Sequence, residues 1–326
     1  MGLILEVEGL KVDLPLPAGN LHAVRTVDFA VRQGETLSLV GESGCGKSLT
    51  ALALMNLLPP RAIRRAVKLV FEGLDLTEAG EEAMSRLRGN RMAMIFQEPM
   101  TSLNPCYTIG NQLVEAYLQH RRASRREARE RAVFLLEKVG ITGAGSRLMQ
   151  FPHQLSGGLR QRIMIAMGLM CGPGLIIADE PTTALDVTIQ AQILALLAEL
   201  QREFQMALIL ITHDLGVVAR VAHRLCVMYC GQVVETGTTK EVFARPLHPY
   251  TQGLLRCIPV PGRLEPGSEL GSIPGLVPTP IGVLKGCTFR NRCPKGRPEC
   301  VVENPHLREI GPNRALRCLD TLASAA

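Results

Sequence analysis

The chain has 326 residues, of which 46% are hydrophobic and 20% charged. This composition excludes a disordered chain, and the length favours about two domains. The net charge of +6 is too small a surplus to argue for nucleic-acid binding by itself. The start of the chain lacks the pattern of a signal peptide, and the longest apolar stretch, 163–178, is too short to span a bilayer. We therefore expect a protein on the cytoplasmic side with reduced cysteines.

Five short apolar runs, each ending at a polar residue or a glycine, predict the strands of a parallel sheet. They lie at residues 37–40, 92–96, 175–178, 208–212 and 227–230. Near-continuous apolar runs are typical of strands that are buried on both faces, and helical patterns such as 48–58 and 187–204 lie between them. This alternation predicts a doubly wound α/β fold with its ligand site at the carboxyl ends of the strands.

Three other segments have a different pattern. Residues up to about 35, together with 67–76, predict short amphipathic strands of a small antiparallel sheet. Residues 99–170 read mostly as helices, which indicates a helical insertion. Residues 259–282 contain six prolines and five glycines and predict a long irregular connection to a cysteine-containing tail.

A phosphate-binding loop is predicted at residues 41–48, whose sequence GESGCGKS fits the pattern G-x-x-x-x-G-K-[ST] between a strand and a helix. Glycines let backbone N–H groups surround an anion, and the start of the following helix adds positive partial charge. Lys47 should reach the β- and γ-phosphates of a nucleotide, and the Ser48 hydroxyl should bind Mg²⁺. The residues expected to hold the nucleotide here are Gly41, Glu42, Ser43, Gly44, Cys45, Gly46, Lys47, Ser48 and Leu49.

Four polar residues at the ends of other predicted strands fit the same site. Asp179 and Glu180 point in opposite directions, so Asp179 is expected to hold Mg²⁺ through water, and Glu180 to orient or deprotonate the attacking water. The amide of Gln97 is placed to contact Mg²⁺ and that water, and His213 to contact the γ-phosphate. Each residue alone is a weak signal, since acidic loop starts and structural histidines are common.

A second anion site is predicted where a helix begins within the sequence LSGGLRQR. Ser156 is a good N-cap, and the glycines after it leave backbone donors open. The alternative is an ordinary capped helix. Two phosphate-binding helix ends in one chain suggest a site shared between two subunits.

In this order, the motifs resemble those of the ATP-binding cassette (ABC) ATPases over residues 1–245. The resemblance implies an ATPase that forms a head-to-tail dimer, in which phosphates bound by one subunit are clamped by Ser156 and Gly158 of the other. It implies Glu180 as the catalytic carboxylate and His213 as the γ-phosphate contact. It adds to the nucleotide site Leu155, Gly157, Gln161 and, from the loop 184–186, Asp186. The aromatic residue that stacks on adenine in such cassettes is absent before Phe29.

The resemblance also implies a division of the chain. Residues 1–98 and 171–245 would form the nucleotide-binding core with its antiparallel part, 99–170 a helical subdomain, and 246–326 a C-terminal extension.

Finer strings, at 96–105, 178–187 and 248–251, resemble the ATPase subunits of dipeptide and oligopeptide importers. This implies a second, paralogous ATPase, two transmembrane permeases, an extracytoplasmic peptide-binding protein and a peripheral location on the cytoplasmic face of the inner membrane. The alternatives are import of nickel, haem precursors or antimicrobial peptides, or a soluble ABC ATPase that acts on nucleic acid or ribosomes. The latter usually has two cassettes or a long coiled coil, neither of which appears here, so we expect no nucleic-acid partner.

Four cysteines lie within 32 residues of the tail, at Cys287, Cys293, Cys300 and Cys318. The tail has few large apolar residues, so a bound metal could organise it. Four thiolates suit either Zn²⁺ or an iron–sulfur cluster, and four unliganded thiols are the remaining alternative. The resemblance to the importer ATPases implies a [4Fe–4S] cluster.

Overall fold

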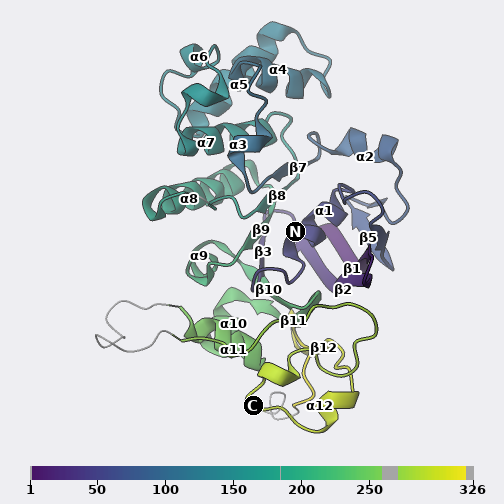
Figure 1. Cartoon of the computed structure of the whole chain (residues 1–326). Coiled ribbons are helices and arrows are strands. Elements are labelled where there is room, and N and C mark those ends of the chain that lie inside the picture. Colours follow the sequence, from purple (N-terminus) through teal and green to yellow (C-terminus); the bar gives the residue numbers. More distant parts are fainter. Residues whose placement is uncertain (1, 184, 259–270, 321–326) are drawn as a thin grey trace. The chain divides into compact units, whose positions relative to one another are not determined.

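The computed structural model describes residues 2–183, 185–258 and 271–320, so most of the predicted Pro- and Gly-rich connection lies outside the described residues. The chain divides into two compact units, each assembled from segments that are distant in sequence. The first unit comprises Met1–Ile4, Val31–Thr36 and Glu78–Ile211, and the second comprises Leu5–Ala30, Leu37–Thr77 and Thr212–Ala326. Figure 1 shows the elements of both units in sequence colours.

The first unit contains three parallel strands that are buried on both faces. They are β7 (Met92–Ile95), β8 (Leu175–Asp179) and β9 (Ala207–Thr212). β8 lies between β7 and β9, and every side chain of β8 and β9 is buried. Three of the five parallel strands predicted from the apolar runs are thereby confirmed, each with one end that shifts by one residue.

Helices make up the rest of the first unit. They are α2 (Glu81–Leu87), α3 (Pro99–Ser102), α4 (Ile109–Leu118), α5 (Arg125–Lys138), α6 (Ala144–Arg147), the 3-10 helix η1 (Pro152–Gln154), α7 (Gly157–Gly168) and α8 (Val187–Phe204). All regular elements within 99–170 are therefore helical, as the predicted fold class requires. The boundaries 1–98, 99–170, 171–245 and 246–326 stay a prediction. No helix in the described ranges is both long and apolar enough to cross a bilayer.

The second unit begins with long strands rather than the short ones expected. β1 (Leu3–Leu16) and β2 (Gly19–Arg32) are fourteen residues each. β1 pairs antiparallel with β4 (Ile63–Arg65) and with β5 (Lys68–Phe71), and β5 pairs antiparallel with β6 (Leu74–Asp75). The predicted antiparallel sheet is thus present. Its strand β2 lies beside β1 and pairs in parallel with β11 on the other side.

The second unit also contains the strand β3, which ends directly before the predicted phosphate loop, and the strands that pair beside it. β3 (Thr36–Val40) pairs parallel with β10 (Arg224–Tyr229), which pairs antiparallel with β11 (Gln232–Thr238). Two strands of the C-terminal region extend this sheet, since β12 (Arg308–Gly311) pairs with β13 (Arg314–Leu316), and β13 pairs with β11. The helices are α1 (Lys47–Leu54), α9 (Leu215–Val221), α10 (Thr239–Ala244), α11 (Pro249–Arg256), η2 (Arg290–Arg292) and α12 (Glu299–Val302).

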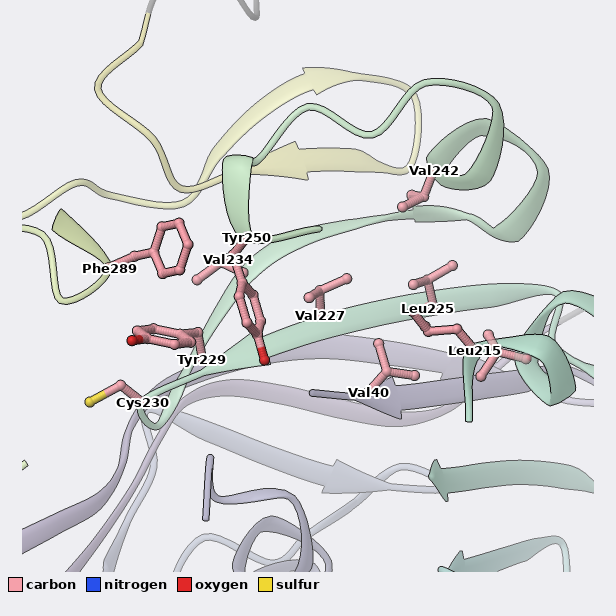
Figure 2. Close-up of a cluster of buried hydrophobic side chains, with 11 residues drawn as sticks. Val40, Leu215, Leu225, Val227, Tyr229, Cys230, Val234, Val242, Tyr250 and Phe289 are labelled. Atoms are coloured by element: carbon pink, nitrogen blue, oxygen red, sulfur yellow. The ribbon is translucent and has the colours of Figure 1, made fainter. Parts of the chain in front are cut away.

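A buried aromatic cluster joins the C-terminal region to the strands of the second unit (Figure 2). The ring of Tyr229, at the end of β10, lies 4.7 Å from that of Tyr250 in α11 and 5.1 Å from that of Phe289, centroid to centroid. Tyr250 is fully buried and Phe289 is 2% exposed. Aromatic pairs at these separations stabilise a core beyond the area they bury. The C-terminal region therefore shares a core with the strands that precede it.

His248, the N-cap of α11, is buried against this cluster and is 2% exposed. Its Nδ1 accepts the backbone N–H of Tyr250 at 3.1 Å, and its own backbone N–H donates to Glu235 at 2.9 Å. Burial lowers the pKa of His248 to about 3, against a hydrogen bond with the backbone of Arg317 that raises it. The side chain is therefore neutral at physiological pH and accepts the capping hydrogen bond.

This burial predicts a loss of stability in mild acid. Between pH 6.5 and 3 the unfolded chain binds a proton at His248 that the folded chain does not bind, so the free energy of unfolding falls as the pH falls. The slope from this group approaches about 1.4 kcal/mol per pH unit. His248→Asn keeps a capping acceptor and cannot titrate, so urea unfolding between pH 7.5 and 5 should show a shallower loss. Parallel pH curves for the two proteins would contradict this assignment.

Candidate nucleotide site

The predicted phosphate loop joins the end of β3 to the start of α1. Gly41, Gly44 and Gly46 have positive φ angles of 152°, 76° and 99°. The backbone at Gly46 passes so close to β2 that a Cβ there would lie 2.5 Å from the carbonyl oxygen of Ala23. The loop therefore depends on glycine for both its curvature and its packing.

Lys47 points back into this loop. Its side chain is buried, and the ammonium donates to the carbonyl oxygens of Gly41 at 2.8 Å and Glu42 at 3.1 Å. The hydroxyl of Thr50 donates to the carbonyl of Gly46 at 2.8 Å, which ties the first turn of α1 to the loop. An ammonium, a helix start and a glycine-rich backbone are the donors that an anionic phosphate requires. The residues present fit the phosphates of a nucleoside triphosphate.

Other residues of the loop differ in exposure. Ser43 and Gly44 are exposed, while Ser48 and Leu49 are partly buried. Cys45 is 1% exposed, and burial raises the pKa of its thiol, although Lys47 acts in the opposite direction. The thiol is therefore neutral and adds no negative charge to the loop.

In the first unit, the structure brings two of the predicted site residues together. The side-chain amide of Gln97, which follows β7, donates to the Glu180 carboxylate at 3.3 Å. The Thr183 hydroxyl donates to the same carboxylate oxygen at 3.0 Å. Asp179 ends β8 and is 5% exposed. Carboxylate, amide and hydroxyl oxygens such as those of Asp179, Gln97 and Ser48 are of the class that Mg²⁺ prefers.

Glu180 has an unusual backbone conformation. Its φ angle is +44°, and its N–H donates to the carbonyl of Ile211 in the neighbouring strand at 3.0 Å. A left-handed conformation at a residue with a Cβ costs about 1–2 kcal/mol, and such residues cluster at functional sites. The strand thus ends abruptly at Asp179, and the Glu180 carboxylate turns toward Gln97.

The predicted second anion site lies at the start of α7. The Ser156 hydroxyl accepts the N–H of Leu159 at 3.4 Å, which confirms Ser156 as the N-cap. A Cβ at Gly158 would lie 3.2 Å from Ile189 in α8, whose own N-cap is Asp186. The starts of α7 and α8 therefore pack together. Gly157 is partly buried, and Leu155 and Gln161 are buried at 5% and 1% exposure.

The remaining predicted residues are placed as follows. His213 directly follows β9 and is exposed. The phosphate loop and His213 belong to the second unit, and Gln97, residues 155–161, Asp179, Glu180 and Asp186 belong to the first. Ala184, in the predicted loop 184–186, lies outside the described residues.

Comparison with known proteins decides the family. Residues 24–183 match the ABC transporter family, and residues 234–300 match the oligopeptide/dipeptide transporter C-terminal region. The chain is 49% identical to the oligopeptide transport ATP-binding protein AppD of Bacillus subtilis over 98% of this chain and 97% of that protein. This chain belongs to the ABC transporter ATPases. It is also 48% identical to the dipeptide transport ATP-binding protein DppD of Escherichia coli, over 97% of this chain and 96% of that protein.

Solved structures agree with the ABC fold. The ABC transporter cassette MJ0796 matches with a TM-score of 0.64 at 25% identity, over 72% of this chain and 99% of that one. The cbiO1 protein of Clostridium perfringens, part of the transporter complex cbiONQ, matches with a TM-score of 0.63 at 27% identity, over 75% and 92%. The predicted fold class and ATP-hydrolysing activity are thereby confirmed, and ATP with Mg²⁺ is the general requirement of this ABC family.

The predicted metal or iron–sulfur centre of this ABC ATPase is wrong. In the part of the chain that the structure describes, no group of three or more His, Cys, Asp or Glu side chains could hold a metal ion. Cys287, Cys293, Cys300 and Cys318 line a cavity of only about 20 Å³ and are free thiols. Burial raises the pKa of Cys287 to about 11, so its side chain is a neutral thiol in this structure.

The physical reason for this error is that interactions other than metal binding connect the C-terminal region to the rest of the second unit. The aromatic cluster and the pairing of β13 with β11 connect it to the rest of the second unit. Buried Arg317 adds hydrogen bonds to the carbonyls of Val233 at 2.8 Å and Pro305 at 3.2 Å. Counting only large apolar residues in the tail misses all of these interactions.

Sequence reasoning also missed two residues that contact the phosphate loop. The Tyr250 hydroxyl accepts the backbone N–H of Glu42 at 2.8 Å, and Arg292 forms an ion pair with the Glu42 side chain at 2.7 Å. Tyr250 lies within one of the strings that carry the importer resemblance, but no local signal marks Arg292.

Two of the loop glycines, Gly44 and Gly46, give a matched test of the ABC phosphate loop. Ala at either position must adopt a positive φ, which costs about 1–2 kcal/mol. Only Gly46→Ala places the new methyl group against the Ala23 carbonyl, whereas nothing lies within 4 Å of a Cβ at Gly44. We expect Gly46→Ala to lose a further ~1–3 kcal/mol of stability in urea unfolding and to abolish ATP binding. Equal effects of Gly44→Ala and Gly46→Ala would show that the close approach is unimportant.

Proposed function

We propose that this ABC ATPase supplies the energy for import of dipeptides or oligopeptides across the cytoplasmic membrane. The observation that carries the proposal is its near-full-length similarity to AppD and DppD, which extends beyond the cassette into the oligopeptide/dipeptide transporter C-terminal region. A similarity confined to the cassette would support only ATP hydrolysis. The C-terminal region is the part that separates peptide-transport relatives from ABC ATPases in general.

The proposed assembly contains two ATPase subunits and two transmembrane permeases. The second ATPase is a paralogue of this chain, and an extracytoplasmic binding protein delivers the peptide to the permeases. This chain then lies peripherally on the cytoplasmic face of the inner membrane. Membership of a transporter family supports permease partners, and the dimeric structure of MJ0796 supports a pair of cassettes. The open start of α7 is the surface that would meet the nucleotide bound by the partner.

In the proposed reaction, water attacks the γ-phosphate of ATP in line with the leaving ADP. Glu180 orients this water and takes a proton from it as it attacks, while Gln97 and Thr183 hold the carboxylate in position. Lys47 and the loop amides bind the phosphates, and His213 contacts the γ-phosphate. Ser48, Gln97 and Asp179 would hold Mg²⁺, which neutralises phosphate charge when bound.

Replacing Glu180 by Gln tests the chemical step. The amide keeps the size of the side chain but orients water poorly and cannot take a proton, so we expect ATP turnover by the assembled complex to fall at least about a hundredfold. ATP affinity should stay within about threefold of wild type, because Glu180 does not belong to the phosphate-binding loop. Glu82→Gln, which removes an exposed carboxylate that pairs with Arg86, is the control and should retain full turnover. Normal turnover by Glu180→Gln would refute its catalytic role.

The cargo requires a separate experiment. The chain is purified from detergent-solubilised native membranes, and the co-purifying proteins are identified by mass spectrometry. We expect two multi-spanning permeases and a second cassette, and the reconstituted complex should accumulate a labelled dipeptide in an ATP-dependent manner. A complex that hydrolyses ATP but transports only a nickel chelate or a haem precursor would refute peptide cargo. Recovery with ribosomes or nucleic acid would refute transport altogether.

A further inference from the structure

A partly buried ion pair links the phosphate loop to a residue 250 positions further along the chain. The Arg292 guanidinium donates one hydrogen bond to each carboxylate oxygen of Glu42, at 2.7 and 2.9 Å. Such a bidentate pair fixes the direction of the carboxylate as well as its distance. Glu42 occupies a variable position of the phosphate-loop pattern, directly after the strand β3 and its following Gly41.

Arg292 is itself held rigidly by the C-terminal region. Its side chain is only 4% exposed, its Nε donates to the carbonyl of Pro274 at 3.0 Å, and one terminal nitrogen also donates to that of Ile273 at 3.0 Å. The guanidinium lies 5.8 Å from the centre of the Tyr229 ring. The position of the Glu42 carboxylate is therefore set by backbone outside the cassette's own motifs.

The backbone of Glu42 is held from the same side. Its N–H donates to the hydroxyl of Tyr250 at 2.8 Å, and the Tyr250 ring is fully buried against the rings of Tyr229 and Phe289 (Figure 2). The carbonyl of Glu42 in turn accepts a hydrogen bond from Lys47. Contacts thus run from the C-terminal region through Glu42 to the lysine that meets the phosphates.

We propose that Arg292 and Tyr250 are positioning residues for ATP binding, through which the C-terminal region sets the conformation and charge of the phosphate loop. Two physical effects follow. The hydrogen bonds hold the loop in one conformation, so less conformational freedom is lost when phosphates bind. Arg292 also neutralises the charge of the Glu42 carboxylate, which would otherwise repel the phosphates of a nucleoside triphosphate at short range.

The charge effect gives a test that a space-filling role would not pass. Arg292→Met leaves the Glu42 charge uncompensated, and we expect it to weaken ATP binding at least tenfold in calorimetric titrations of the full chain with ATP and Mg²⁺. Adding Glu42→Gln removes that charge with little change in shape. The double variant should bind ATP at least threefold more tightly than Arg292→Met alone. In the assembled complex the change should appear mainly in KM rather than in kcat.

Two further variants keep the test decisive. Arg297→Met is the matched control, because it breaks another C-terminal ion pair, with Asp320 at 2.6 Å, that does not contact the loop. Its ATP affinity should equal that of wild type. Tyr250→Phe keeps the buried ring and removes only the hydroxyl that accepts the Glu42 amide, so it should bind ATP more weakly even if Arg292→Met fails to fold. ATP affinity unchanged in Tyr250→Phe, or no gain from Glu42→Gln in the Arg292→Met background, would overturn the proposal.

Discussion

A strand that is buried on both faces has room for charged side chains and open backbone only where it ends. β8 and β9 are entirely buried, and so is β3. The desolvation cost of a polar group within such a strand is several kcal/mol unless it is paired, about as much as the whole stability margin of many proteins. Asp179, His213 and the phosphate loop follow these strands directly. Burial of the sheet therefore decides where the chemistry of this ABC ATPase can lie.

The same constraint determines how the loops after the strands are held. A backbone N–H beside a buried sheet needs a partner, because water cannot reach it. At Glu180 the partner is the carbonyl of Ile211 in the adjacent strand, which the left-handed turn makes accessible. At Glu42 no strand supplies an acceptor, and the hydroxyl of Tyr250 takes that place. The backbone N–H groups of Glu180 and Glu42 are thus satisfied in different ways, and the acceptor for Glu42 comes from the C-terminal region.

The predictability of the site depended on how local each determinant was. Apolar runs identified the parallel strands, and the capping role of Ser156 could be read from its neighbours, because both signals lie within a few residues. β10 begins three residues before its predicted start. The strand already pairs with β3 at Arg224, a charged residue that the search for apolar runs did not include. Arg292 and the metal-free order of the tail depend on contacts across the fold. The low apolar content of the tail suggested that a metal bound by the four cysteines organises it. The aromatic cluster and the pairing of β13 with β11 connect the tail to the second unit instead.

The Glu42–Arg292 pair is poorly explained as a device for stability. Burying a charge such as that of Arg292 costs several kcal/mol, and well-packed apolar residues of the same volume often stabilise a fold as much as an ion pair or more. Apolar residues cannot fix the orientation of the loop, because dispersion contacts have no preferred direction. A bidentate pair fixes the orientation of the Glu42 side chain. That constraint reaches the phosphate loop, because the Glu42 carbonyl accepts a hydrogen bond from the Lys47 ammonium. The charge pair thus belongs to the nucleotide site, although half of it lies in the transporter-specific region.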